Sequence, residues 1–346
     1  GGGALLLGIQ PKVSRMDIYN DFNCDLVNLF LCARECTIQL VQELKFLPLH
    51  SRAEFDLLKE FMKHKELLQQ RIADERNAVM ECFSGEEREE LLLILRERSR
   101  LFDVQRAAAY YKVCRGSFSG TTTSFGVKPN NITNFLYLFD DASKRLQDVI
   151  IENKDCLDII RERDGPDSLI YCDPPYFDAE SLYVVDFPTE KHEELHWILS
   201  QCAGYIVVSY NDCPFIRSLY GDFYILAFRR NNPLSQKAGA TYGELIITNY
   251  DPRPYIQPQF SMFPAEIENG DLVLVHEPAC GSLREINIRK KNENETIHEP
   301  APVGAGSSTG HSGALPVGGN GSYVSDGNRQ AQYSPDQPTD ERSSGA

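Results

Sequence analysis

One tetrapeptide in this sequence combines a carboxylate, two rigid residues and an aromatic ring. It is Asp173-Pro174-Pro175-Tyr176, and it follows an apolar run over 168–172 that predicts a strand buried on both faces. The prolines fix the backbone, so the Asp173 carboxylate and the Pro174 carbonyl point the same way. Each could accept one N–H of an exocyclic amine and localise its lone pair, while Tyr176 stacks on the ring. The structural alternative is a rigid strand end with a capping Asp.

A second pattern competes with the first. His192, Glu193 and His196 form an H-E-x-x-H arrangement inside a predicted helix over 189–199. On a helix this spacing puts both imidazoles on one face, where they could ligate zinc with Glu193 as the general base. The sequence offers no pattern for a third ligand, and an ordinary helix covering a sheet also fits. A zinc metallopeptidase is therefore the alternative function.

Composition limits the class of protein. The chain has 346 residues, and 35 Lys and Arg against 50 Asp and Glu give a formal net charge of −15. This length and the 42% hydrophobic content indicate one large or two small globular domains. No apolar run reaches the ~18 residues of a membrane helix. The ten Cys form no Cys-x-x-Cys pair and are typical of reduced thiols, so we expect a cytoplasmic protein. The acidic balance alone argues against a nucleic-acid partner.

The first part of the sequence predicts mainly helices, because apolar residues recur there at spacings of three and four. In chain order we expect a glycine turn at 1–3 that opens a short helix, a strand over 13–19, a helix that starts near 22, nearly continuous helices over 36–112 with capping boxes at Ser51 and Ser84, a helical segment at 91–95 buried on all sides, and a loop or loose hairpin at 114–126.

From about residue 146 the pattern alternates between strands and helices, which favours a mostly parallel, doubly wound sheet. The expected strands are 149–151, 168–172, 205–209, a closing pair at 224–228 and 244–248, and one further strand at 271–276 that the sequence does not place. Residues 301–346 contain nine Gly, eight Ser and four Pro, which is typical of a disordered tail.

The order of these features resembles the Dam-type DNA N6-adenine methyltransferases, in which a glycine loop, a target-recognition region and Asp-Pro-Pro-Tyr follow one another. The resemblance covers roughly residues 1–250. It implies a Rossmann-like α/β sheet of the class I S-adenosylmethionine-dependent methyltransferases with an inserted, mainly helical target-recognition domain. The implied division is a catalytic domain over 1–35 and 136–250, a recognition domain over 36–135, a C-terminal extension over 251–290 and a disordered tail over 291–346.

The resemblance also implies roles for individual residues. It places Asp173, Pro174, Pro175 and Tyr176 at the catalytic centre, Gly1, Gly3, Asp21, Asp155 and Asp173 around S-adenosylmethionine, and Lys112, Arg115, Phe118 and Ser119 on DNA. The implied reaction moves a methyl group from S-adenosylmethionine to the N6 of an adenine flipped out of double-stranded DNA, without a metal. The implied protein is a monomer, and the implied partner is a cognate restriction enzyme.

The sequence departs from the family pattern at two places. It lacks the Lys/Gly-rich segment and the Phe that open the family's cofactor loop, so we expect the central strand of the sheet to be missing. Cys114 and Ser119 stand where the family usually has Asn, which leaves the target sequence open. An inactive DNA-binding remnant is therefore a second alternative. The stretch 104–139 carries four Lys and Arg without any Asp or Glu, which predicts a locally basic DNA face.

Overall fold

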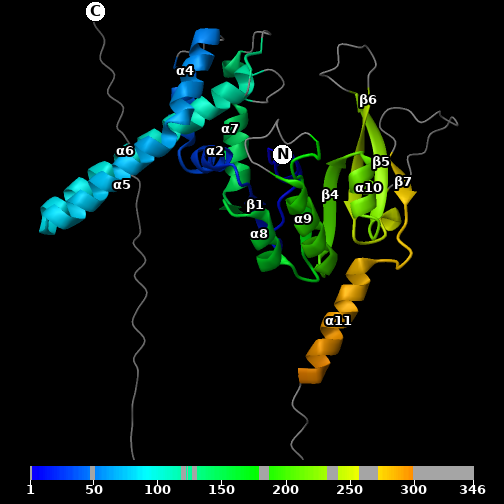
Figure 1. Ribbon diagram of the computed structural model, residues 1–346. Coiled ribbons are helices and arrows are strands. Elements are labelled where there is room, and N and C mark those ends of the chain that lie inside the picture. The colour runs from blue at the N-terminus through cyan, green and yellow to red at the C-terminus, as the bar shows by residue number, and fades with distance from the viewer. Residues whose placement is uncertain are drawn as a thin grey trace, which may run out of the picture. The chain divides into compact units, whose positions relative to one another are not determined.

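The computed structural model describes residues 2–46, 51–117, 122, 124–126, 131–178, 187–231, 241–256 and 272–298, and Gly1–His298 is one compact unit (Figure 1). Its helices are α1 (Ala4–Gly8), α2 (Cys24–Glu35), α3 (Thr37–Lys45), α4 (Arg52–Lys63), α5 (Lys65–Cys82), α6 (Gly85–Gly116), α7 (Leu138–Leu146), α8 (Cys156–Arg163), α9 (Thr189–Gln201), α10 (Pro214–Leu219) and α11 (Leu283–His298). Short 3₁₀ turns occur at η2 (Ile132–Phe135) and η4 (Arg253–Tyr255). The strands are β1 (Asp17–Asn20), β2 (Val149–Glu152), β3 (Leu169–Cys172), β4 (Tyr205–Asn211), β5 (Tyr224–Asn231), β6 (Thr241–Thr248) and β7 (Val273–His276).

The described strands form two sheets. β1 and β2 pair in parallel, and the second sheet has the order β3-β4-β6-β5-β7. In the second sheet only β3 and β4 are parallel, while β6 pairs antiparallel with β4 and β5, and β7 antiparallel with β5. The mostly parallel sheet expected from the sequence is therefore wrong for this half. Nine residues separate β5 from β6, too few for the crossover that parallel strands need, and the two strands pair antiparallel.

β3 is exposed on one face, which contradicts the burial on both faces predicted from its apolar run. Leu169 and Tyr171 are 66% and 42% exposed, whereas Ile170 and Cys172 pack against the core. Successive side chains of a strand point to opposite faces. Residues of α8 and α9 cover the face with Ile170 and Cys172. The apolar composition of β3 therefore does not predict whether another element covers each of its two faces.

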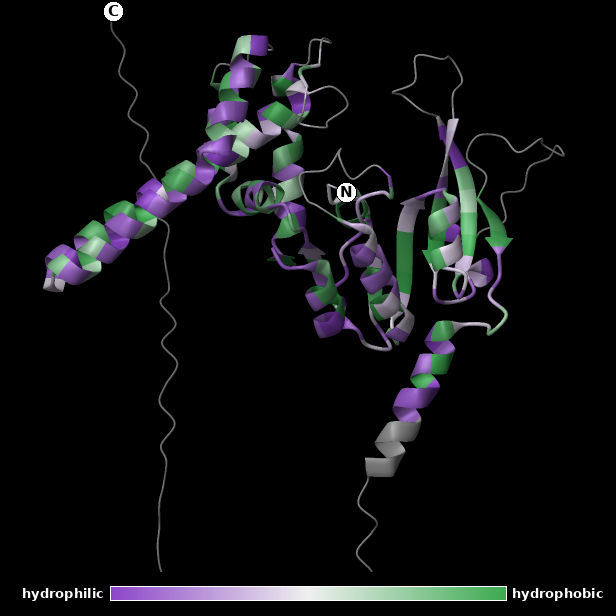
Figure 2. Ribbon diagram, in the orientation of Figure 1, coloured by the Kyte–Doolittle hydropathy of each residue, from purple (hydrophilic) through white to green (hydrophobic). Residues whose placement is uncertain are grey.

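The main core lies between the second sheet and the helices α8, α9 and α10. Its fully buried side chains include Leu195, Leu199, Ile206, Ile216 and Leu245. Figure 2 shows that the central strands of this sheet are mostly hydrophobic, as expected of strands packed under helices. This core fixes the position of the strand ends from which the candidate site is built.

A second core joins the first sheet to the helices of the first half. It contains Tyr19 and Val149 from β1 and β2, Phe30 from α2, Leu40 from α3 and Ala107 from α6. The predicted helical region 36–135 and the predicted catalytic region therefore share one core. Its helices are as expected, and Ser51 Oγ accepts a hydrogen bond from the Glu54 amide at 3.1 Å. Ser84 makes no such cap bond, so that capping box is wrong.

α5 and α6 run side by side as a long helical hairpin (Figure 1). Leu93 and Ile94 in α6 are 57% and 50% exposed, which contradicts the expected burial of 91–95 on all sides. A helix in a two-helix hairpin has only one face covered by its partner, and of these three residues only Leu95 is buried. Apolar residues therefore remain on the outer face of the hairpin.

The C-terminal part of the described chain adds a strand and a helix. β7 confirms a strand within 271–276 and lies beside β5, and α11 continues to His298, past the tail boundary expected at 291. None of the described helices is long and apolar enough to cross a membrane.

Asp17 anchors the start of β1, which begins four residues later than the sequence predicts. Its carboxylate accepts hydrogen bonds of 2.6 Å from Arg15 Nε and from Arg145 Nη2, and Arg145 Nε also donates to the Leu6 carbonyl. The bond from Arg15 is the largest cause that lowers the pKa of Asp17, and Arg145 adds to it. The guanidinium of Arg145 thus ties α7 to β1 and α1.

We expect Arg145→Met to lower the free energy of unfolding by about 2–4 kcal/mol, because it leaves a buried carboxylate with one partner fewer. Since the pKa of Asp17 is lowered in the folded state, its contribution is complete above the ordinary Asp pKa and disappears as the pH falls. Urea unfolding at pH 7 and at acidic pH measures both effects. Lys144→Met is the control, because Lys144 belongs to an exposed pair with Asp140 and should cost less than about 1 kcal/mol. Equal losses for the two variants at pH 7 would contradict the prediction.

Candidate active site

The loop after β3 holds Asp173 at the carboxyl end of the strand. Ser209 Oγ, in the neighbouring strand β4, donates to Asp173 Oδ1 at 2.8 Å, and the hydroxyl of Tyr171 lies 3.1 Å from Ser209 Oγ. A hydroxyl carries one proton, so the hydrogen bonds run from Tyr171 to Ser209 and from Ser209 to Asp173. Asp173 itself is exposed. Its carboxylate is therefore oriented by buried Ser209, in a residue that is exposed to solvent.

Tyr176 is anchored by the antiparallel strand β6. Its hydroxyl donates to Glu244 Oε1 at 3.5 Å, and Arg230 Nη1 in β5 donates to both oxygens of Glu244 at 3.1 and 3.3 Å. Glu244 is only 5% exposed. The backbone after Tyr176 is fixed by Asn211, whose Nδ2 donates to the Phe177 carbonyl at 2.9 Å. The Tyr176 ring thus has a defined place beside Asp173.

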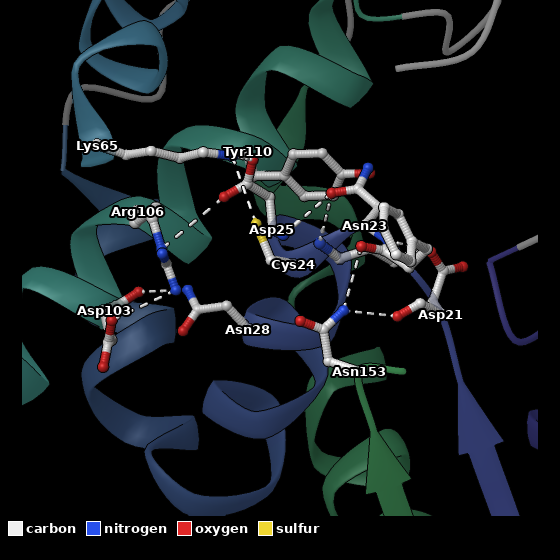
Figure 3. A network of polar contacts seen from close by, with 12 residues as sticks. Asp21, Asn23, Cys24, Asp25, Asn28, Lys65, Asp103, Arg106, Tyr110 and Asn153 are labelled. Atoms are coloured by element: carbon white, nitrogen blue, oxygen red, sulfur yellow. Dashed lines mark hydrogen bonds and ion pairs between the residues drawn. The ribbon is translucent and has the colours of Figure 1, made fainter. Parts of the chain in front are cut away.

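Asp21 lies directly after β1 in a turn that leads into α2. Its Oδ1 accepts from the Asn23 amide at 2.8 Å and its Oδ2 from the Tyr19 hydroxyl at 3.3 Å. Asn153 Nδ2 donates to the Asp21 carbonyl at 2.7 Å (Figure 3). A carboxylate has about four lone-pair positions, so Asp21 keeps acceptor capacity for further donors.

Asp155 follows β2 and is the N-cap of α8. Its Oδ1 accepts from the Leu157 amide at 2.9 Å, and Lys191 Nζ of α9 donates to its Oδ2 at the same distance. Burial raises the pKa of Asp155, but the bonds from Lys191 and Leu157 outweigh burial and leave the pKa below its ordinary value. Asp155 is therefore ionised at neutral pH and already engaged with a cation.

Parallel pairing brings two of the predicted cofactor residues to the same edge. Asn20 at the end of β1 pairs with Glu152 at the end of β2, and Asn20 and Lys154 exchange two further hydrogen bonds. The chain leaves both strands here toward Asp21 and Asp155. Asp173 follows β3 in the other sheet, and among the described strands β1 does not pair with β3.

The glycine turn before α1 has a backbone that favours glycine. Gly2 and Gly3 have φ of 64° and 70°, and a Cβ on Gly3 would lie 2.9 Å from the Phe30 ring. Gly1 lies outside the described residues. The donors and acceptors at this edge fit S-adenosylmethionine in their chemistry, because the Asp21 carboxylate can accept from two ribose hydroxyls.

The predicted DNA residues are only partly described. Arg115 lies in the last turn of α6, where its guanidinium is 4.6 Å from the Phe135 ring centroid. Ser117 and Phe125 form an antiparallel bridge, which agrees with the expected hairpin, whereas Phe118 and Ser119 between them lie outside the described residues.

The basic character predicted for 104–139 is weaker in the folded chain. Lys112 has a side chain that is 10% exposed, donates to the Phe46 carbonyl at 2.8 Å and lies 3.7 Å from a Glu54 oxygen. Arg106 is 6% exposed and faces Asp25 and Asp103. Two of the four cations are thus turned into the protein, because acidic residues outside this stretch in sequence meet them in space.

The H-E-x-x-H pair has structural partners. His192 is fully buried and its Nδ1 lies 2.8 Å from the Tyr210 hydroxyl, whereas His196 Nε2 lies 2.8 Å from Asp222 Oδ1. The part of the chain that is described contains no group of three His, Cys, Asp or Glu side chains able to hold a metal ion. The alternative of a zinc peptidase therefore finds no support.

Sequence reasoning missed the residues that orient the predicted site. The sequence pattern identifies Ser209 and Glu244 only as parts of strands and gives Lys191 no role. A Ser and a Glu within otherwise apolar strands are the signal that could have found them, because buried polar groups need partners.

A family model for the D12 class N6 adenine-specific DNA methyltransferases matches residues 1–231. The match includes the Asp173 loop, the Asp21 and Asp155 turns and the helices α2–α6.

We expect a chelator such as EDTA to leave the melting temperature unchanged, because His192 and His196 are held by Tyr210 and Asp222. Tyr210→Phe should instead lower the free energy of unfolding by about 1 kcal/mol through loss of the hydrogen bond to His192. Tyr137→Phe is the control, since Tyr137 is 65% exposed. Calorimetry measures both, and a melting temperature that falls with EDTA and recovers with zinc would contradict the assignment.

Proposed function

Since the chain belongs to the D12 class N6 adenine-specific DNA methyltransferase family, we propose that the loop after β3 holds the adenine whose N6 is methylated. The observation that carries the proposal is the hydrogen bond from Ser209 to Asp173, within the 231 residues that the family covers. A carboxylate that is oriented from the sheet in a solvent-exposed residue suits an amine-binding group. Tyr176 lies three residues further on, anchored by Glu244.

The chemistry of the loop follows from the electronic structure of adenine. The N6 lone pair is delocalised into the ring, which makes the free base a poor nucleophile. Asp173 and the Pro174 carbonyl would each accept one N6–H and draw the lone pair back onto nitrogen, while Pro175 keeps the two acceptors fixed. Tyr176 would stack on the base. This arrangement works by orientation and by stabilising the developing positive charge on N6.

Three turns would hold S-adenosylmethionine, which supplies a methyl group activated by the sulfonium charge. The Gly2-Gly3 turn allows close approach of the backbone, and the exposed side of Asp21 accepts from the ribose hydroxyls. Asp155 is expected beside the cofactor's adenine, and its pairing with Lys191 means that one of its oxygens is already used. Gly1 and Gly3 of the glycine turn would also contact the cofactor, and Asp173 would lie next to its methyl group.

Double-stranded DNA would meet the end of α6. Arg115 is the described residue that we expect to contact the duplex, together with Phe118 as a wedge and Ser119, and flipping the adenine costs a few kcal/mol. Lys112 would need to release Glu54 and the Phe46 carbonyl before it could contact a phosphate. We further expect a monomer that acts beside a cognate restriction enzyme.

Asp173→Ala should lower kcat for methyl transfer by a factor of about 10³ or more, because the lone pair of N6 is no longer localised. Transfer of a radioactive methyl group to duplex DNA measures this loss, and fluorescence anisotropy should show DNA binding within about two-fold. Asp167→Ala is the control, since Asp167 is exposed and precedes β3. Normal turnover by Asp173→Ala would contradict the site. DNA binding by the unmodified chain without any methyl transfer would favour the inactive remnant.

Ser209→Ala should lower kcat about ten-fold without changing KM for DNA, because the variant keeps the carboxylate but loses its orientation. Ser209→Thr retains a hydroxyl and should recover most of the rate. Ser200→Ala, on the exposed end of α9, is the control and should behave like the unmodified chain. Steady-state kinetics of the four proteins test the role of Ser209, and a KM effect without a kcat effect would contradict it.

A further inference from the structure

A cluster of buried charges lies beside the Asp21 turn and joins three helices. Figure 3 shows Asp25 of α2 between Lys65, the first residue of α5, and Arg106 of α6. Lys65 Nζ donates to Asp25 Oδ2 and lies 3.5 Å from the Cys24 sulfur. Arg106 Nε is 3.8 Å from Asp25 Oδ1. None of these residues belongs to the site derived above.

The cluster is too buried to be a surface ion pair. Asp25 is 7% exposed, Arg106 is 6% exposed, and the Lys65 side chain is 18% exposed. Asp25 Oδ1 and Arg106 Nε have no hydrogen-bond partner among the described residues, so the carboxylate relies on Lys65 for its short contact. Buried charges persist only when they are compensated. Burial lowers the pKa of Lys65, but its bond to Asp25 outweighs burial and leaves the pKa above its ordinary value.

Asp25 is connected to the predicted cofactor turn through one residue. The Asp25 amide donates to Asn23 Oδ1 at 3.0 Å as part of the N-cap of α2, and the Asn23 amide donates to Asp21 Oδ1 at 2.8 Å. A displacement of Asp25 therefore moves the first turn of α2, its cap and the Asp21 carboxylate together. Lys65, which donates to the Asp25 carboxylate, stands at the opposite end of this chain of hydrogen bonds from Asp21.

The same turn also touches α6. Asn23 Nδ2 donates to the Tyr110 hydroxyl at 3.3 Å, and Arg106 lies one turn before Tyr110 in the helix. α6 then continues to Arg115, where we expect DNA. Helix α6 thus contacts the Asp21 turn through Tyr110 and ends in the predicted DNA interface. Lys65 connects α5 to the same turn through Asp25.

We propose that Lys65 is a positioning residue that holds the Asp21 turn in its cofactor-binding geometry through Asp25 and so couples the helices α5 and α6 to S-adenosylmethionine binding. This inference rests on the proposed function, because it takes Asp21 to be a cofactor residue. It goes further in naming a residue 44 positions away that sets the affinity of that turn. The coupling is reciprocal, so DNA and S-adenosylmethionine should each strengthen the binding of the other.

The central test compares Lys65→Met with Lys65→Arg in steady-state kinetics and in direct binding of S-adenosylmethionine by calorimetry. Lys65→Met should raise KM and Kd for S-adenosylmethionine about five- to fifty-fold and leave kcat within about two-fold. Lys65→Arg, which keeps the charge, should recover most of the affinity. Addition of duplex DNA should tighten binding in the unmodified chain and not in Lys65→Met.

A second readout does not depend on the cofactor. Hydrogen exchange of the amides over residues 21–28 should be faster in Lys65→Met, while exchange in α9 stays unchanged. Lys63→Met is the matched control, because Lys63 is two residues away and forms an exposed pair with Glu60. It should match the unmodified chain in every measurement. If Lys65→Met does not fold, Asp25→Asn, which keeps the side-chain shape, takes its place with the same expectations.

The possible outcomes separate the two proposals. Unchanged affinity and unchanged exchange in Lys65→Met overturn the role of Lys65 and leave the proposed function intact. A parallel fall in kcat, affinity and melting temperature also overturns it, since it shows only a structural role. If the unmodified chain neither binds S-adenosylmethionine nor transfers methyl groups, the proposed function fails. In that case exchange over 21–28 alone decides whether Lys65 holds the turn.

Discussion

Parallel pairing of neighbouring strands is the constraint on which the candidate site depends. The register of β1 with β2 places the turns that carry Asp21 and Asp155 at one edge. The pairing of β3 with β4 aligns Cys172 with Val208, so that the next residues, Asp173 and Ser209, come within hydrogen-bonding distance. A shift of one residue in either register would turn these side chains to the opposite face.

The antiparallel strand β6 supplies Glu244, the residue that orients Tyr176. Asn211 at the end of β4 pairs with Glu244 in β6, so one strand pairing provides both the amide that binds the Phe177 carbonyl and the carboxylate that binds Tyr176. Each predicted functional side chain on the described strands and turns therefore has a second residue that orients it. Such partners narrow the range of side-chain positions before any ligand binds.

Local patterns predicted the helices, most strands and the Asp173 loop, because these depend on residues that are close in sequence. The orienting partners could not be predicted in this way. Ser209 is 36 residues from Asp173, Glu244 is 68 residues from Tyr176, and Lys65 is 40 residues from Asp25. The prediction that β3 and the 91–95 segment of α6 are buried on all sides was wrong for a related reason. The exposed positions of β3 and α6 are apolar, and apolar composition does not tell whether another element covers them.

Charge shows most clearly why sequence counts differ from the folded molecule. The stretch 104–139 contains only positive charges, yet Arg106 meets Asp25 and Asp103, and Lys112 meets Glu54. These cations form ion pairs with acids of α2, of α4 and of α6 itself one turn earlier. Part of the positive charge of this stretch therefore fixes the position of α6. Arg115, at the end of that helix, packs on the aromatic ring of Phe135. In an acidic chain, the helix that we expect to approach DNA is thus held in place by the ion pairs of Arg106 and Lys112.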